Sequence, residues 1–182
     1  MDGKPEHKAY FNQSMIFNLP DWADSNMLAK AWDKLTLHHD ALRLRFSYCD
    51  GAWMQEYAEP GSHNYNIQTY DLSANDEKNL SETIFQLSES VKNGTHLQMG
   101  PLVNIGFFLC KDFNRVLITI HHLAVDVVSW QIIKEDFGNL LWQLKENKSL
   151  ELPLKTDSYK NWILAHHSSD YKHITDKYRN FW

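Results

Sequence analysis

Hydrophobic residues follow two different periods along this chain, and the periods alternate from one stretch to the next. Every second residue is apolar in residues 15–19 and 42–48, which predicts strands, and residues 53–57 are expected to form the strand that returns after 42–48. Residues 102–110 and 115–120 are predicted to form two further strands, and the β-branched apolar run at 116–120 is typical of a buried strand. A spacing of three to four predicts helices with buried faces formed by Leu28, Ala31, Trp32 and Leu35, by Leu80, Ile84, Leu87 and Val91, and by Trp130, Ile133, Phe137, Leu140, Leu141 and Leu144. Because helices and strands interleave, we expect an α/β fold, a two-layer sandwich of a mixed β-sheet with helices.

Local signals mark the ends of several elements. Asp24 or Ser25 is placed to cap the first helix. The pair Asp50-Gly51 predicts a tight hairpin turn between two strands. One or two further helices are expected in residues 158–182, after a break at residues 152–154.

Composition fits one folded domain and argues against several classes of protein. The chain has 182 residues, 43% of them hydrophobic, which is enough for a single domain with a core. The net charge is −5 and basic residues form no stripe, so we expect no nucleic-acid partner. No apolar run approaches the roughly 20 residues of a membrane helix, so we expect no membrane partner. Cys49 and Cys110 form no Cys-x-x-Cys pattern and are expected to be buried free thiols of a cytoplasmic protein.

Two histidines directly follow the strand predicted at 115–120. His121, His122 and Asp126 therefore lie in a short loop before the helix that begins near Trp130, and catalytic groups are often mounted at such rigid ends. The ordinary pKa of histidine, about 6.5, lets a neutral ring accept a proton near neutral pH. Asp126 could orient a ring or pair with a cation, while a hydrogen-bonded structural pair is the alternative interpretation of the histidines.

Metal binding is a further interpretation of a chain with ten histidines. Three adjacent pairs occur without the spacing of zinc motifs: His38-His39, His121-His122 and His166-His167. Neighbouring side chains on a helix point in different directions, so a helical pair cannot readily hold one ion. The sequence therefore predicts no metal site.

The loop and the following helix resemble a motif of a known family. The HHxxxDxxSW motif of the condensation-domain superfamily of nonribosomal peptide synthetases, which has the chloramphenicol-acetyltransferase-like fold, is matched by His121, His122, Asp126, Ser129 and Trp130. A second match is closest to epimerization domains and consists of His38, His39, Asp40, Ala41, Leu42 and Arg43. The Phe-Asn-Gln-Ser stretch at 11–14 and residues 156–162 resemble further parts of that subgroup.

This resemblance implies a substrate and roles for the histidines. The substrate would be an aminoacyl or peptidyl thioester on the phosphopantetheine arm of a peptidyl carrier protein. In an epimerization domain His122 would be the general acid/base that moves the α-proton, and in a condensation domain it would orient or deprotonate the acceptor amine. His121 belongs to the same candidate catalytic pair and is expected to be its structural member. No cofactor is expected to bind directly, and adjacent synthetase domains are further partners.

Members of this superfamily have two similar lobes with the reaction centre in a tunnel between them. Residues 1–182 are interpreted as the amino-terminal lobe, either a fragment or a naturally short protein, with the carboxy-terminal lobe missing. Such a lobe is expected to show little activity alone. Val127 stands where the family usually has glycine, and it would strain the loop if a positive φ were required there.

Other residues are expected to hold the loop. Arg43 and Arg45 alternate with apolar neighbours, so either both face solvent or one of them pairs with Asp126. Arg43, which matches the motif arginine of the family, is the favoured partner for such a pair. Ser129 is expected to cap the helix, and Trp130 is expected to pack beneath it.

Two further functions fit the same residues. A non-catalytic module that docks a carrier protein would keep the fold; Val127 and the missing half favour it, and the intact His122 and Asp126 argue against it. A carrier-independent acyltransferase of the same fold would share the His-x-x-x-Asp core but has less reason for the Ser-Trp ending.

Overall fold

The computed structural model describes residues 11–61 and 63–166 of the chain. The chain divides into two compact units, residues 1–151 and 152–182. In the second unit the described residues form the short helix α4 (Tyr159–His166). The rest of the helical region predicted at 158–182, including His167, lies outside the described residues. The histidine loop belongs to the first unit.

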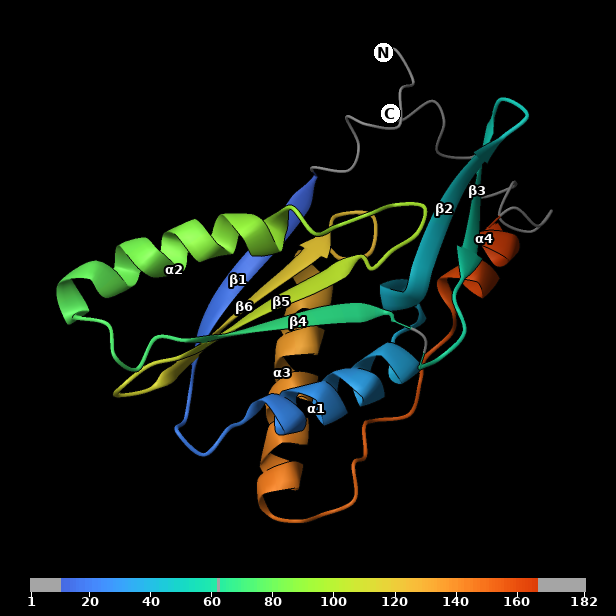
Figure 1. Ribbon diagram of the computed structural model, residues 1–182. Coiled ribbons are helices and arrows are strands. Elements are labelled where there is room, and N and C mark those ends of the chain that lie inside the picture. The colour runs from blue at the N-terminus through green and yellow to red at the C-terminus, as the bar shows by residue number, and fades with distance from the viewer. Residues whose placement is uncertain (1–10, 62, 167–182) are drawn as a thin grey trace, which may run out of the picture. The chain divides into compact units, whose positions relative to one another are not determined.

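A four-stranded sheet forms the centre of the first unit (Figure 1). Its order is β1 (Asn12–Leu19), β6 (Asn114–His121), β5 (Val103–Leu109) and β4 (Tyr65–Asp71). β4 and β5 are parallel, whereas the other neighbouring strands are antiparallel. Helix α2 (Glu77–Lys92) lies in the crossover connection that a parallel pair requires. The sheet is therefore mixed, as the sequence predicted.

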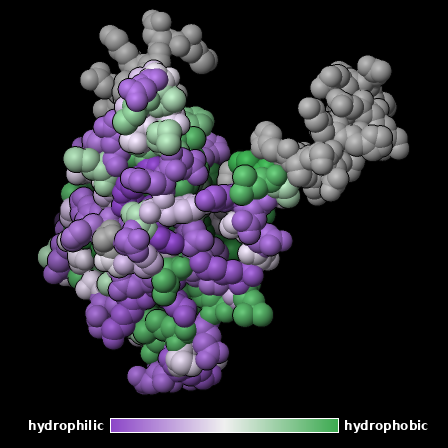
Figure 2. Space-filling view, turned by 90° about the vertical axis from the view of Figure 1, so that its right-hand side faces the viewer, coloured by the Kyte–Doolittle hydropathy of each residue, from purple (hydrophilic) through white to green (hydrophobic). Residues whose placement is uncertain are grey.

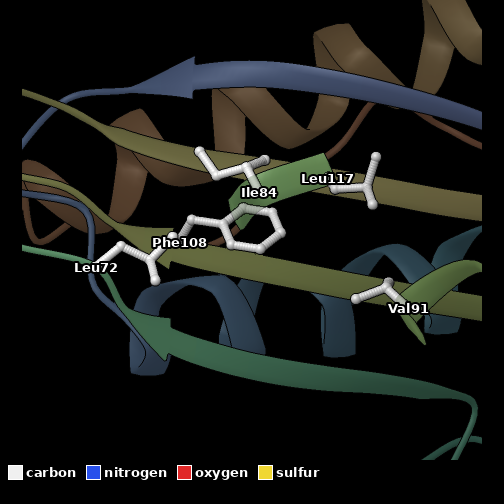
Figure 3. Packing of buried hydrophobic residues seen from close by; sticks show 5 residues of the cluster. All are labelled: Leu72, Ile84, Val91, Phe108 and Leu117. Carbon is white, nitrogen blue, oxygen red and sulfur yellow. The ribbon is translucent and has the colours of Figure 1, made fainter. Parts of the chain in front are cut away.

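Helices cover both faces of this sheet (Figure 1). α2 packs on one face, where the buried cluster in Figure 3 consists of Leu72, Ile84, Val91, Phe108 and Leu117. α1 (Ser25–His38) and α3 (Val127–Lys145) pack against each other on the opposite face. The predicted α/β class is confirmed, and the structure places a helical layer on each face where the sequence predicted a single one.

The predicted cap and hairpin lie where the sequence placed them. Asp24 is the N-cap of α1, and its carboxylate accepts a hydrogen bond from the main-chain N–H of Met27 at 2.8 Å. The hairpin of β2 (Leu44–Cys49) and β3 (Ala52–Tyr57) turns at Asp50 and Gly51. These two residues have positive φ angles of 51° and 81°, which a two-residue hairpin turn of this kind requires.

The strand predicted at 42–48 begins only at Leu44, because the preceding residues form the 3₁₀ turn η2 (Asp40–Arg43). The turn interrupts the alternation on which the expected exposure of Arg43 and Arg45 depended. Both arginines are buried, with exposed fractions of 8% and 9%, so the alternative in which both face solvent is wrong. Burial also lowers the pKa of Arg45.

Hydrophilic side chains dominate the face drawn in Figure 2, and hydrophobic side chains form separate patches among them. Such a mixed surface is normal for a folded domain. None of the helices in the described ranges is both long and apolar enough to cross a membrane. Both cysteines are free, but Cys49 is exposed at the end of β2 beside the hairpin turn. The predicted burial is therefore wrong for Cys49, whereas Cys110 is half-buried.

Candidate active site

The histidine loop connects the end of β6 to the beginning of α3, as the sequence predicted. His121 is the last residue of β6, and Asp126 is the N-cap of α3. β1 runs beside β6, and the main-chain carbonyl of Phe11 accepts a hydrogen bond from the N–H of His122 at 2.8 Å. The loop is therefore anchored by a strand, a helix and a neighbouring strand.

His121 is buried, and it forms hydrogen bonds within the loop. Its ring Nδ1 accepts a hydrogen bond from the main-chain N–H of Leu123 at 3.2 Å, and its carbonyl accepts one from Ala124 at 2.9 Å. These bonds close the turn that follows β6. With an exposed fraction of 1%, His121 is almost completely buried.

His122 is only half-buried, and both of its ring nitrogens have partners. Nδ1 lies 2.8 Å from the carbonyl oxygen of Val125, and Nε2 lies 3.0 Å from Nε2 of Gln13. A carbonyl oxygen only accepts, so the neutral ring carries its proton on Nδ1 and has its lone pair on Nε2. The ring of Phe11 stacks on His122 with centroids 4.9 Å apart. In this tautomer the accepting nitrogen of the ring is Nε2, on the side of Gln13.

Gln13 and Phe11 are site residues to which the sequence pattern assigned no role. Both belong to the Phe-Asn-Gln-Ser stretch, whose one distinguishing feature in the sequence is its resemblance to a family motif. Gln13 also accepts a hydrogen bond from the indole Nε1–H of Trp130 at 2.8 Å. Trp130 is buried at the start of α3, as expected, and this bond connects it to the ring of His122 through Gln13.

Asp126 holds the loop in a different way from the one predicted. Its Oδ1 accepts hydrogen bonds from the main-chain N–H and the hydroxyl of Ser129, at 2.7 and 2.6 Å. The cap is therefore Asp126, and the prediction that Ser129 caps the helix is wrong, since Ser129 donates to the cap. The hydroxyl of Ser129, and then its main-chain N–H, lower the pKa of Asp126.

Arg43 does not pair with Asp126, so this prediction is wrong. Its guanidinium donates to the side chain of Asp40 at 2.7 Å, to the carbonyl of Thr36 at 2.9 Å and to the carbonyl of Ala58. These bonds connect the end of α1 to the end of the β2–β3 hairpin. Arg43 is thus a structural residue of a neighbouring turn, because η2 directs its side chain there.

Val127 is the first residue of α3 and is exposed. It is absent from the residues with positive φ in the described part of the chain, which are Asp50, Gly51, Gly61, His63, Gly100 and Asn147. The loop therefore requires no glycine-like conformation at this position. Val127 therefore does not cause the strain that a positive φ at this position would have produced.

His38, His39 and Asp136 lie together at the end of α1. His39 is the C-cap, with φ −97° and ψ 95°, and its Nε2 lies 2.7 Å from Oδ2 of Asp136. One ligand atom from each residue lies within 4.8 Å of the others, a grouping that could hold a metal ion. The argument that a helical pair points apart does not apply to these two histidines, because His39 lies beyond the last helical residue. The His39–Asp136 bond links α1 to α3 without needing an ion.

The N-cap role of Asp126 predicts a measurable loss of stability. Asp126→Ala should lower the free energy of unfolding by about 1 kcal/mol, because α3 loses its cap. His122→Ala should cost less, since a half-buried ring loses little packing. Thermal melting of the two variants compares these effects. Equal and negligible shifts in melting temperature would contradict the capping role.

The charge of Asp126 adds a pH dependence to this effect. Its pKa is lower in the folded chain than the unperturbed value of 3.8, so its charge stabilises the fold above about pH 4. This stabilisation is lost as the pH falls through the folded pKa. Asp126→Asn, which keeps an accepting oxygen without the charge, should therefore melt below the wild type at neutral pH and approach it in acid.

The α/β fold holds the half-buried His122 on a loop between the end of a mixed sheet and a capped helix. The chain belongs to the condensation-domain family, since the family model described as "Condensation domain" matches residues 4–182. The family expected from the sequence motifs is thereby confirmed.

Individual relatives agree with this assignment. The chain is 35% identical over 153 residues to tyrocidine synthase 2 of Brevibacillus parabrevis, covering 84% of this chain and 4% of that protein. It is 34% identical to the crystal structure of the epimerization domain from the third module of tyrocidine synthetase B, with a TM-score of 0.80, covering 85% of this chain and 34% of that chain. The first condensation domain of the calcium-dependent antibiotic synthetase is 16% identical with a TM-score of 0.73, covering 93% and 41%, and shows the fold alone. The chain therefore spans less than half the length of each of these proteins.

Proposed function

We propose that this chain is the amino-terminal lobe of an epimerization-type domain in a cytoplasmic nonribosomal peptide synthetase. Its substrate would be an aminoacyl or peptidyl thioester on the phosphopantetheine arm of a carrier protein, with no cofactor bound to the lobe itself. The observation that carries the proposal is the hydrogen bond between Nδ1 of His122 and the carbonyl of Val125, which leaves the lone pair of a neutral ring on Nε2. The likeness to the tyrocidine epimerization domain supports epimerization over condensation.

In the proposed reaction, one proton is removed from the α-carbon and another proton is then added to it. His122 Nε2 takes the α-proton, and the electron pair of the broken C–H bond passes into the thioester carbonyl, which becomes an enolate. A carboxylic acid from the second lobe returns a proton to the opposite face of the α-carbon, so the configuration is inverted. The two groups exchange roles for the reverse direction.

Exposed apolar residues around the loop support a second lobe as the missing wall of the site. Phe11, Val127 and Val128 are exposed to 66%, 73% and 67%, and Leu123 is exposed to 53%. An apolar group of this kind beside a catalytic side chain is costly to leave in water and is typical of a surface that a partner covers. The carrier protein and the adjacent synthetase domains are the other proposed partners.

Condensation is the second candidate function, and the family model that matches the chain supports it. The same Nε2 lone pair would then take a proton from an acceptor amine that attacks the thioester. A non-catalytic docking module has less support, because Val127 begins α3 without a positive φ. The conformation around Val127 therefore gives no reason to expect a disabled loop.

Exchange with heavy water separates epimerization from condensation. The test protein joins this chain to the carboxy-terminal lobe of the tyrocidine epimerization domain that it resembles; it is called the two-lobe protein below. With a carrier-bound aminoacyl substrate in heavy water, we expect deuterium at the α-carbon and formation of the D-isomer, measured by mass analysis with chiral separation. Joining of two carrier-bound substrates without α-deuterium would refute epimerization and favour condensation.

A further inference from the structure

The side-chain amide of Gln13 contacts two residues that are distant in the sequence. Its Oε1 lies 2.8 Å from Nε1 of Trp130, and its Nε2 lies 3.0 Å from Nε2 of His122. An indole N–H only donates, so the oxygen of the amide must face Trp130. The NH₂ group must then face His122, and the orientation of the amide is determined by its partners.

This orientation decides the protonation of His122. An amide NH₂ group only donates, so Nε2 of His122 must accept and cannot carry a proton in this arrangement. At the other side of the ring, the carbonyl of Val125 independently requires a proton on Nδ1. Both neighbours therefore select the same neutral tautomer.

The three side chains are held by different parts of the fold. Gln13 lies on β1, where it pairs with Ile120 of β6, and Trp130 lies in the first turn of α3 with an exposed fraction of 2%. His122 stands on the loop between β6 and α3. Movement of the Gln13 amide is thus restricted by a strand on one side and a buried indole on the other.

We propose that Gln13, oriented by Trp130, is a positioning residue that keeps His122 in the neutral Nδ1–H tautomer and reserves the Nε2 lone pair for proton transfer. The proposal deepens, and rests on, the proposed role of His122. The amide cannot turn over to accept from a protonated Nε2, because its NH₂ group would then face the indole N–H. The α-hydrogen of the substrate must therefore replace the Gln13 donor at Nε2, which keeps the ring neutral until substrate arrives.

Nitrogen NMR of the 182-residue chain with ¹⁵N-labelled histidine tests this directly at slightly alkaline pH, with His122→Ala assigning the signals. In the wild type we expect an unprotonated Nε2 and a protonated Nδ1 for His122. Gln13→Glu replaces the donor by an accepting carboxylate, so Nε2 should become protonated. Trp130→Phe removes the indole donor and lets the amide turn over, so a fraction of the Nε2–H tautomer should appear.

Matched controls lie on the exposed face of α3. Gln131→Glu adds the same charge one residue from Trp130, and Trp142→Phe makes the same truncation at an indole that is 51% exposed. Both controls should leave the His122 signals unchanged. A protonated Nε2 in the wild type, or unchanged His122 signals in Gln13→Glu, would overturn the proposal.

The two-lobe protein separates this inference from the proposed function. Gln13→Glu should lower α-deuterium uptake by about 10- to 100-fold, which is the usual loss when the residue that hydrogen-bonds and orients a metal-binding histidine is replaced. Gln131→Glu should leave α-deuterium uptake unchanged. If His122→Ala leaves uptake unchanged, the proposed function fails, but the NMR signals still decide whether Gln13 sets the tautomer. If uptake depends on His122 and not on Gln13, the positioning role fails alone.

Discussion

His122→Ala in the two-lobe protein is expected to lower α-deuterium uptake by about 10²- to 10⁴-fold, the usual contribution of a positioned general acid or base. The reason is that Nε2 of His122 is the proposed proton acceptor, and alanine leaves nothing in its place. D-isomer formation should fall by the same factor, because both products arise from one deprotonation. Mass analysis with chiral separation measures the two together.

A loss of activity would carry little meaning if the variant were misfolded. The ring of His122 is half-buried and bonds to Gln13 and Val125, so melting temperature should be measured beside activity. His63→Asn is the control: His63 is an exposed histidine with φ 42°, a conformation that asparagine tolerates. It should retain full uptake. Uptake by His122→Ala that matches this control would remove His122 from the mechanism.

Local signals in the sequence predicted most of the fold. The cap at Asp24, the Asp50-Gly51 turn and the apolar face of α1 depend on residues a few positions apart, which the sequence displays directly. The loop between β6 and α3 was located for the same reason. The N-cap role of Asp126 could also have been predicted from the sequence, since an Asp shortly before a helical pattern is a common signal for the start of a helix.

The contacts around His122 could not be predicted in this way. Gln13 and His122 are 109 residues apart, and their contact depends on the pairing of β1 with β6. Hydrophobic alternation shows that a strand exists but not which strand lies beside it. The Arg43–Asp126 pair was wrong for a related reason, because one turn of 3₁₀ helix changes the direction of every following side chain.

The 182-residue chain alone is expected to show no turnover of a carrier-bound aminoacyl thioester, whereas the two-lobe protein should show it. In the proposed mechanism, Nε2 of His122 is the proton-transfer group that this chain contributes, and inversion needs a second group on the opposite face of the α-carbon. Phe11, Val127 and Val128 around the loop are exposed, so water would surround any enolate formed there. Solvent exclusion is part of what an enclosed site supplies.

Three proteins should be compared with the same substrate: the chain alone, the two-lobe protein, and the two-lobe protein with His122→Ala. Uptake of α-deuterium only in the second would show that the lobes act together and that this chain contributes the histidine. The isolated carboxy-terminal lobe is a further control, because it should be inactive for lack of His122. Strong uptake by the 182-residue chain alone would mean that its own residues complete the site, and the two-lobe argument would then be wrong.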